Sequence, residues 1–156
     1  MAEGEKARLI AWGNELQAVH RRLRQTLQAA RSAIRAGSSN APAEHDLLLF
    51  CHGFCAALTG HHEGERDELF PAIATQYPEL RDALRTLEED HSLIARLLDD
   101  LRAATDRADA PDRLERHLDG IAAIMESHFQ YEERQLLSIL ETLQLDADPR
   151  HVFGRL

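Results

Sequence analysis

The sequence predicts an all-α protein, folded as an up-down-up-down four-helix bundle. Leu and Ala are plentiful, and aromatic residues make up only 5% of the 156 residues, a composition that favours helices over a β-sandwich or barrel. Four segments repeat their apolar residues at helical spacing, and clusters of Gly, Pro and small polar residues separate them. We find no strand-like alternation and no interdomain linker. A chain of this length is expected to bury one hydrophobic core.

The first two predicted helices are separated by the strongest breaker cluster in the chain. The first helix covers about residues 5–36 and ends at the cluster 37–42, which reads Gly-Ser-Ser-Asn-Ala-Pro. The second covers about residues 43–69. Pro71 then kinks this helix or opens a short extra turn, which ends before Pro78.

Proline also marks the boundary between the last two helices. The third helix covers about residues 79–104, and the fourth covers about 112–143 with Pro111 as its first residue. We therefore assign residues 1–145 to the bundle and residues 146–156 to a loose C-terminal tail.

Charge and composition restrict the function and the location of the protein. A formal net charge of -9 argues against binding to nucleic acid or to anionic membranes, because both need a basic surface. Residues 1–13 do not resemble a secretory signal, and no run of about 18 apolar residues could span a membrane. Cys51 and Cys55 are expected to be reduced core thiols. These features indicate a cytoplasmic protein, and they leave its oligomeric state open.

Polar residues interrupt the core-facing stripe of every predicted helix. Each stripe recurs at alternating steps of three and four residues. Its apolar members are Leu9, Leu16, Leu23, Leu27, Ala30 and Ile34 in the first helix, Leu47, Cys51, Phe54 and Leu58 in the second, Leu80, Leu84, Leu87, Ile94, Leu98 and Leu101 in the third, and Ile121, Met125, Leu136 (or its neighbour Gln135), Ile139 and Leu143 in the fourth. A histidine breaks the stripe once per helix, and in the second and fourth helices a glutamate follows four residues later. These six residues are His20, His61, Glu65, His91, His128 and Glu132.

A metal site explains these six residues together. A lone histidine on an apolar face is usually a core residue with a hydrogen-bond partner, but four on four helices are not explained in that way. A buried polar group without a partner costs about 1–3 kcal/mol, and an unpaired carboxylate costs more. Cations remove that cost, and imidazole nitrogen with carboxylate oxygen is a ligand set of iron, manganese and zinc.

The spacing of the six residues indicates two metal ions. Each His-x-x-x-Glu pair lies on one helix face, so that the histidine can bind one ion while the glutamate reaches between two. The steps His20 to His61 (41 residues) and His91 to His128 (37 residues) divide the positions into two similar halves. The simplest assembly has four terminal histidines and two bridging glutamates.

The pattern H…HxxxE…H…HxxxE resembles that of the hemerythrin-like proteins, the HHE cation-binding group, and in particular their actinobacterial type. The resemblance is carried by 60–65 (Gly-His-His-Glu-Gly-Glu), 69–71 (Leu-Phe-Pro), 89–91 (Glu-Asp-His) and 128–133. It implies a non-haem di-iron centre whose two iron ions share an oxo or hydroxo bridge and the carboxylates. Manganese or zinc stays a possible alternative to iron.

The chain departs from the oxygen-carrying hemerythrins at two positions. Those proteins have a second histidine one turn after the third-helix ligand, where this chain has Ala95, and their last carboxylate would fall on Glu133 rather than Glu132. A missing histidine opens a position for exchange. The resemblance therefore implies binding or turnover of hydrogen peroxide, oxygen or nitric oxide in oxidative or nitrosative stress. A catalase- or peroxidase-like activity and a non-enzymatic sensor or iron-binding role both stay open.

Other arrangements fit the sequence less well. A ferritin-like di-iron site needs Glu-x-x-His on two helices. Glu88 with His91 provides one such pair, but three residues before His128, where the second glutamate would have to be, the chain has Met125. A structural zinc ion needs four ligands, fewer than the six residues present. A metal-free interaction bundle is the remaining alternative.

Several neighbouring residues have roles that the sequence leaves open. His62 could be a further ligand or a surface residue, since it lies about 100° round the helix from His61. Asp90 and Glu133 could orient ligand histidines, and Tyr131 could lie near the metals. The remaining residues with an open or a surface assignment are His45, His52, Gly60, Gly64, His117 and His151.

Overall fold

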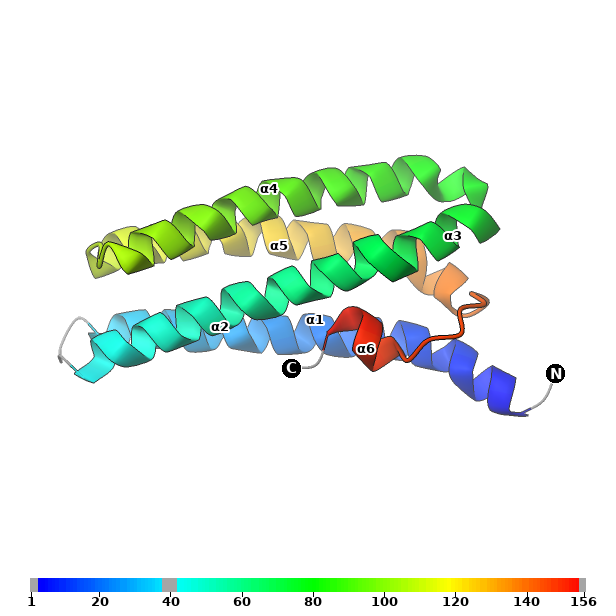
Figure 1. Ribbon diagram of the computed structural model, residues 1–156, viewed down its shortest axis with the longest axis horizontal. Coiled ribbons are helices and arrows are strands. Elements are labelled where there is room, and N and C mark those ends of the chain that lie inside the picture. Colours follow the sequence, from blue (N-terminus) through cyan, green and yellow to red (C-terminus); the bar gives the residue numbers. More distant parts are fainter. Residues whose placement is uncertain (1–2, 38–41, 155–156) are drawn as a thin grey trace.

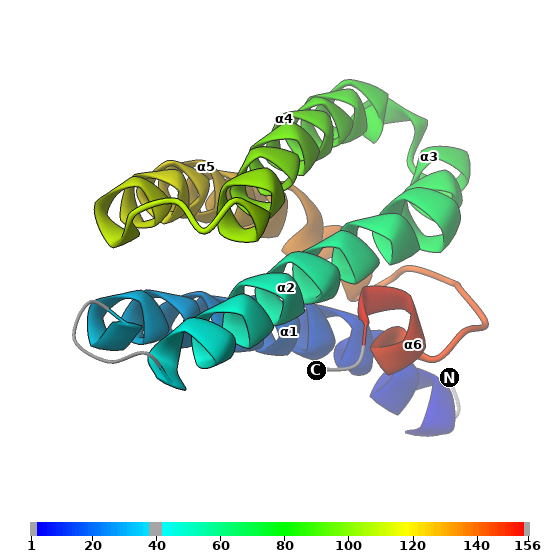
Figure 2. The same ribbon diagram turned by 60° about the vertical axis from the view of Figure 1, so that its left-hand side comes forward.

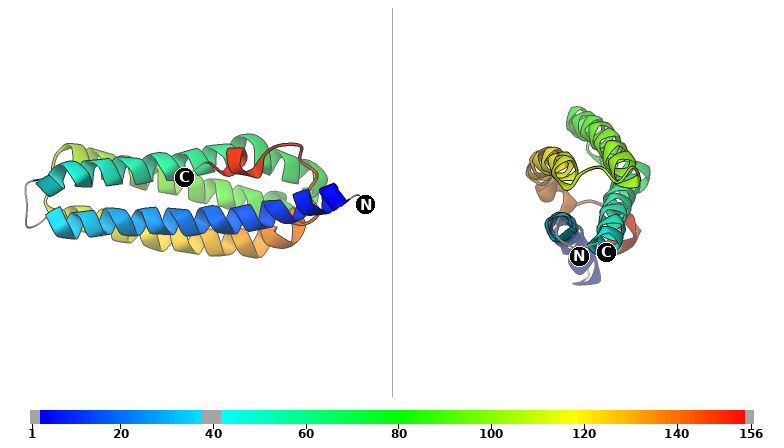
Figure 3. Two further views of the ribbon diagram at one scale, coloured as in Figure 1. Left: turned by 90° about the horizontal axis from the view of Figure 1, so that it is seen from below. Right: turned by 90° about the vertical axis from the view of Figure 1, so that its left-hand side faces the viewer.

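The computed structural model describes residues 3–37 and 42–154, and it describes side chains for residues 12–35 and 50–154. Its long helices in these ranges are α1 (Glu3–Gly37), α2 (Pro42–Gly64), α4 (Arg81–Asp106) and α5 (Pro111–Leu140). Consecutive helices run in opposite directions, as Figure 1 shows. The end-on view of Figure 3 shows them as the four members of one bundle, in which α1 packs on α2 and α5 while α4 packs on α5 and α2. The predicted all-α bundle is confirmed.

Short helical segments join α2 to α4 at one end of the bundle. These are η1 (Glu65–Leu69), α3 (Phe70–Gln76) and η2 (Pro78–Leu80). η1 is a π-helical turn, in which the N–H of Phe70 donates to the carbonyl of Glu65. The extra turn predicted before Pro78 is therefore present as α3, with Pro71 in its first turn.

The connection between α4 and α5 contains a strained residue. Ala108 has φ 54°, in the left-handed region that costs a residue with a Cβ atom about 1–2 kcal/mol. Pro111 is the first residue of α5, as predicted, because its missing N–H has no acceptor in a first helical turn. Most of the breaker cluster between α1 and α2, residues 38–41, lies outside the described residues.

The core follows the predicted stripes, with small differences. Of the predicted stripe residues, Leu9 and Leu47 lie outside the described side chains. Leu80 and Ile139 are half-buried, whereas Leu140, one residue beyond the predicted stripe position, is fully buried. The other apolar stripe residues are buried: Leu16, Leu23, Leu27, Ala30, Ile34, Cys51, Phe54, Leu58, Leu84, Leu87, Ile94, Leu98, Leu101, Ile121, Met125, Leu136 and Leu143.

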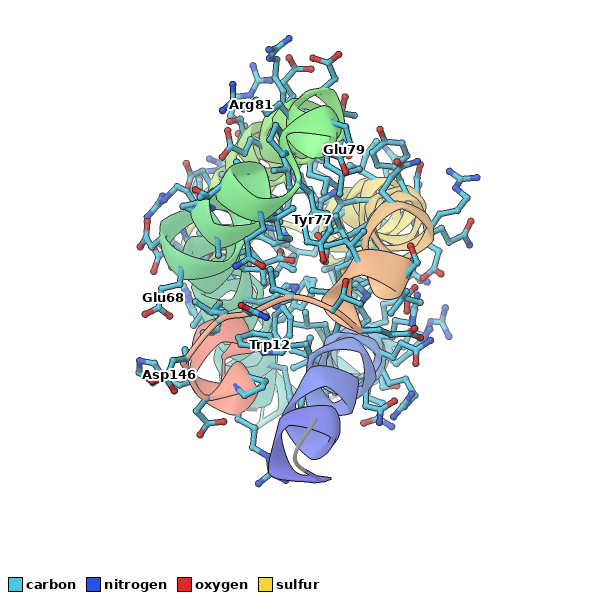
Figure 4. The ribbon with its side chains drawn as sticks, turned by 90° about the vertical axis from the view of Figure 1, so that its right-hand side faces the viewer. Trp12, Glu68, Tyr77, Glu79, Arg81 and Asp146 are labelled. Atoms are coloured by element: carbon cyan, nitrogen blue, oxygen red, sulfur yellow. The ribbon has the colours of Figure 1, made fainter. Side chains whose placement is uncertain are left out.

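The C-terminal segment is not the loose tail that the sequence predicts. Residues Pro149–Phe153 form α6. Asp148 is its N-cap, and the side chain of Asp148 accepts a hydrogen bond from the N–H of Arg150. α6 lies on α1 and α2 (Figure 2), where Phe153 is 1% exposed and meets the Trp12 ring edge-on at 5.6 Å. Figure 4 shows Trp12 between α1 and α6. The expectation failed because a five-residue helix has no periodic pattern of its own, and its apolar residues bury only against this bundle.

None of the described helices has the length and the apolar character needed to cross a membrane. Cys51 and Cys55 are free thiols and buried, as predicted, and burial raises the pKa of Cys55 to about 11.

Candidate metal centre

All four long helices, together with η1, direct histidine or glutamate side chains that could hold a metal ion into the interior of the bundle. The structure brings the six predicted residues together and adds His62. α1 contributes His20, α2 contributes two histidines, η1 one glutamate, α4 one histidine, and α5 a histidine and a glutamate. The seven residues are His20, His61, His62, Glu65, His91, His128 and Glu132.

These residues form two adjacent groups among the described side chains. The first group, which we name group A, consists of His20, His61 and Glu132. Within each group one potential ligand atom per residue lies within 4.8 Å of the others. The second group, which we name group B, consists of His62, Glu65, His91 and His128.

The spacing of the donor atoms is that of ligands around a metal ion. Donors bonded at about 2.1 Å and at angles of 90° to 109° are separated by about 3.0–3.4 Å. The Nε2 atoms of His91 and His128 lie 3.1 Å apart, and Nε2 of His91 lies 3.3 Å from Oε1 of Glu65. The metal-free side chains therefore already have the separations that a shared ion requires.

Both carboxylates lie between the two groups. Oε1 of Glu132 is 3.2 Å from Nε2 of His20 in group A, while its Oε2 is 3.4 Å from Nε2 of His128 in group B. Oε1 of Glu65 is 3.3 Å from Nε2 of His61 in group A and equally far from Nε2 of His91. Each glutamate thus contacts one histidine of each group, the position that a bridging carboxylate occupies.

Most of these donor atoms have no hydrogen-bond partner. Within the described part of the chain, the buried atoms without one include both ring nitrogens of His20, Nε2 of His61, Nε2 of His62, and both oxygens of Glu65 and of Glu132. Buried polar atoms are almost always paired in folded proteins, because an unpaired one costs about 1–3 kcal/mol. Orphaned donors that converge within each of two groups are therefore what a cation-binding site would present.

The two buried glutamates have pKa values that are shifted in opposite directions. Burial, and then the charge of Glu132, raise the pKa of Glu65 well above its ordinary value. Burial also acts to raise the pKa of Glu132, but the neighbouring His128 and His20 outweigh it and hold that pKa well below normal. Without a cation, Glu65 therefore keeps its proton beside an ionised Glu132.

The pKa values of the histidines are also shifted in opposite directions. Burial lowers the pKa of His61 and of His91 to about 3, so both rings are neutral and can bind a metal. Burial also lowers the pKa of His20 and of His128, but their contacts with Glu132 outweigh it and the net pKa of each is raised. A cation would replace the proton on those two rings.

Residues outside the two groups lie within hydrogen-bond distance of the second ring nitrogen of two of these histidines, His61 and His128. Oδ2 of Asp90 lies 3.1 Å from Nδ1 of His128, as expected for an orienting carboxylate. Oε1 of Glu133 lies 3.8 Å from Nδ1 of His20, which places Glu133 outside the donor shell that contains Glu132. The carbonyl oxygen of Phe153 lies 3.0 Å from Nδ1 of His61, a contact that the sequence does not predict.

His62 lies inside the centre and not on the surface. It is 8% exposed, and its ring stacks on that of His91 at 3.8 Å between centroids. His62 precedes Glu65 by three residues, so the two side chains lie on the same side of the helix. The sequence alone does not say that this side of the helix meets His91 of α4.

The other described histidines and Tyr131 belong to neither group. His52 is exposed and 3.2 Å from Asp106, His151 is exposed, and His117 is half-buried rather than solvent-facing. The side chain of His45 lies outside the described residues. Tyr131 is half-buried, with the guanidinium of Arg134 over its ring at 5.9 Å.

The comparison with known families agrees with this geometry. The family model of the hemerythrin HHE cation-binding domain matches residues 14–148, a range that contains every residue of groups A and B. No curated protein and no solved structure matches the chain. The actinobacterial subtype stays a prediction, because the family model does not distinguish it. Since the match covers most of the chain, the protein belongs to the hemerythrin HHE cation-binding family.

Proposed function

We propose that the protein is a non-haem di-iron protein that binds or turns over small oxidants, namely hydrogen peroxide, oxygen or nitric oxide. The observation that carries this proposal is the convergence of orphaned histidine and carboxylate donors from four helices on two adjacent points of the core. Nitrogen and oxygen donors in this mixture suit iron, and manganese or zinc are the alternatives. A bound iron pair would supply electron transfer to or from the small molecule.

Two ions, rather than one, are supported by the positions of the glutamates. Glu65 and Glu132 each contact a histidine of group A and a histidine of group B. Seven donors around a single ion would also leave the farther side chains without a partner. We therefore infer one ion in each group, with both carboxylates shared.

A cavity gives small molecules access to group B. It has a volume of about 370 Å³, lies between α2 and α4, and is lined by His62, His91, Ala95, Ser92 and Thr59 among others. A water molecule occupies about 30 Å³, so peroxide, oxygen and nitric oxide all fit. His91 forms part of the cavity wall and is 10% exposed, whereas the side chains of His20 and His61 in group A are fully buried.

Ala95 favours a protein that reacts with small oxidants over one that carries oxygen. It lines this cavity one turn after His91, at the position where the resemblance places a further histidine in oxygen carriers. An imidazole there would fill the space beside His91 and could add a ligand. The methyl group of Ala95 leaves room instead for an exchangeable small molecule.

The residues of the chain hold the ligand rings ready for this role. Because Nδ1 of His61 donates to a carbonyl and Nδ1 of His128 faces Asp90, the Nε2 atoms of both rings point into the centre. Phe129 stacks on His20 at 3.8 Å and shields group A from water. We further propose that the protein acts in the cytoplasm, where its two buried thiols stay reduced.

Metal analysis followed by stopped-flow spectroscopy tests the proposal. Protein loaded with ferrous iron under argon should bind about two iron ions per chain. Mixing with peroxide in the stopped-flow instrument should oxidise this iron to the ferric state. Oxygen evolution from peroxide would identify a catalase-like enzyme. A stable adduct with oxygen or nitric oxide, released under vacuum, would identify a sensor. His61→Ala should abolish the signals, and a purified protein without iron, manganese or zinc would contradict the proposal.

A further inference from the structure

The short helix α6 lies beside group A, although it belongs to no part of the family match, which ends at residue 148. It packs on α1, α2 and η1, the elements that contribute His20, His61 and Glu65. Val152 and Phe153 are 0% and 1% exposed. The segment therefore covers the part of the bundle where α1, α2 and η1 meet.

Gly64 allows α6 to approach this closely. A Cβ atom at Gly64 would lie 1.6 Å from the carbonyl oxygen of Val152 and 2.7 Å from its carbonyl carbon. Atoms do not approach so closely, so α6 can occupy this position only if residue 64 is glycine. Gly60, one turn earlier on α2, has no atom within 4 Å of a Cβ placed there. Of the two glycines beside the ligands, close backbone approach explains only Gly64.

A second glycine turns the chain over His61. Gly154 follows α6 with φ +92°, a conformation that residues with a Cβ atom rarely adopt. Its backbone lies against that of His61, where a Cβ atom would be 3.5 Å from the amide nitrogen. The carbonyl of Phe153, which precedes Gly154, is thereby held at the edge of the His61 ring, beside Nδ1.

The contact that results is a buried hydrogen bond. Nδ1 of His61 lies 3.0 Å from the carbonyl oxygen of Phe153. A carbonyl can only accept, so Nδ1 must carry the proton, and Nε2 is then the unprotonated nitrogen. That nitrogen is the one directed at Glu65, without a hydrogen-bond partner of its own.

We propose that α6 is a positioning element for the metal centre. The carbonyl of Phe153 holds His61 in the Nδ1–H tautomer and presents Nε2 to group A, and Gly64 and Gly154 are the residues that admit this carbonyl. The effect of this role on metal affinity rests on the metal binding proposed above. The hydrogen bond between His61 and Phe153 can be measured in protein without metal. Loss of such an orienting partner lowers metal affinity by about 10- to 100-fold in other sites.

The test compares Gly64→Ala with Gly60→Ala in the full-length protein. Both changes replace a glycine of α2 with alanine, and only Gly64→Ala collides with α6. In metal-free, 15N-labelled protein we expect Gly64→Ala to lose the protonated Nδ1 signal of His61, and Gly60→Ala to keep it. With ferrous iron alone, in competition with a chelator under argon, Gly64→Ala should bind about 10- to 100-fold more weakly.

Two further variants separate positioning from simple stability. Gly154→Ala disturbs the same carbonyl from outside the bundle helices, so it provides the test even where Gly64→Ala does not fold. Trp12→Leu removes the packing against the Phe153 ring and leaves α6 and the residues of groups A and B unchanged, so it should lower the melting temperature while the tautomer and the iron affinity stay unchanged.

The proposal is overturned if Gly64→Ala and Gly154→Ala fold and keep the Nδ1–H tautomer. It is also overturned if Trp12→Leu loses the tautomer and the affinity to the same extent, since side-chain packing would then be the cause. A tautomer that behaves as expected in a protein that binds no iron would contradict the proposed function and leave the positioning of His61 by α6 intact.

Discussion

Asp90 on α4 orients His128 on α5 across the helix interface. Oδ2 of Asp90 lies 3.1 Å from Nδ1 of His128, and the Nε2 atom on the other side of the ring lies 3.4 Å from Glu132 and 3.1 Å from His91. The carboxylate therefore fixes the ring by a bond that uses the nitrogen not needed for metal binding. Carboxylate partners of this kind also raise the basicity of a ligand imidazole.

Removing this carboxylate should weaken metal binding without removing a ligand. We expect Asp90→Ala to lower the affinity for ferrous iron by about 10- to 100-fold, measured by chelator competition under argon. Asp99→Ala is the matched control, because Asp99 is an exposed aspartate of the same helix that pairs with Arg102. Equal affinities of the two variants would show that Asp90 has no orienting role.

The role of His62 can be decided by a second pair of variants. Because His62 is buried and stacks on His91, we expect His62→Ala to lower the iron affinity and to change the absorption spectrum of the loaded protein. His52→Ala, an exposed histidine of the same helix, should change neither. Wild-type iron content and spectrum in His62→Ala would place His62 beside the centre as a packing residue.

The stability of the metal-free protein should depend on pH through its neutral histidines. Burial, and then the charge of His128, lower the pKa of His91 to about 3 from an ordinary value of 6.5. The unfolded chain therefore binds a proton below pH 6.5 that the folded protein does not bind. The contribution of His91 is fully present above pH 6.5 and is lost as the pH falls toward 3.

This sign can be measured against a variant that cannot titrate. Between pH 6 and pH 4, urea unfolding of chelator-treated protein should show the free energy of wild type falling by about 1.4 kcal/mol more per pH unit than that of His91→Gln. The raised pKa of His20 is common to both proteins, and its contribution cancels in this difference. Parallel pH profiles would mean that His91 takes up a proton in the folded state.

Filling the cavity beside His91 should slow access to group B. Ala95→Phe places a ring in that cavity without changing a predicted ligand, so the iron content should stay the same. The rate of reaction with nitric oxide or peroxide in stopped-flow should fall by roughly tenfold, equivalent to about 1.4 kcal/mol of added barrier. Ala103→Phe, at an exposed position of the same helix, is the control. An unchanged rate in Ala95→Phe would show that small molecules enter elsewhere.

A backbone change far from the centre should stabilise the fold. Ala108 has φ 54°, and Ala108→Gly removes the contact between its Cβ and the backbone, so we expect the free energy of unfolding to rise by up to about 1 kcal/mol. Ala103→Gly, in the helical part of α4, should lower it by about 1 kcal/mol. Urea denaturation measures both, and a loss of stability in Ala108→Gly would contradict the strain.

The sequence by itself determined the helices and the six residues predicted as ligands. Apolar residues at helical spacing can bury only on one side of a helix, and a histidine in such a stripe must therefore enter the core. For that reason His20 and Glu132 could be assigned from spacing alone, and the structure places both at 0% exposure. Whether the predicted residues bind metal stays a prediction that the experiments above test.

Only the tertiary structure decided how the centre is completed. His62 joins group B because its ring packs on that of His91 of α4, and no residue pattern in one helix specifies a contact with another helix. The contact of His61 with the carbonyl of Phe153 joins residues 92 positions apart. A backbone carbonyl leaves no trace in the residue types of a sequence, and α6 has too few residues to show a period, so this partner exists only once the bundle has folded.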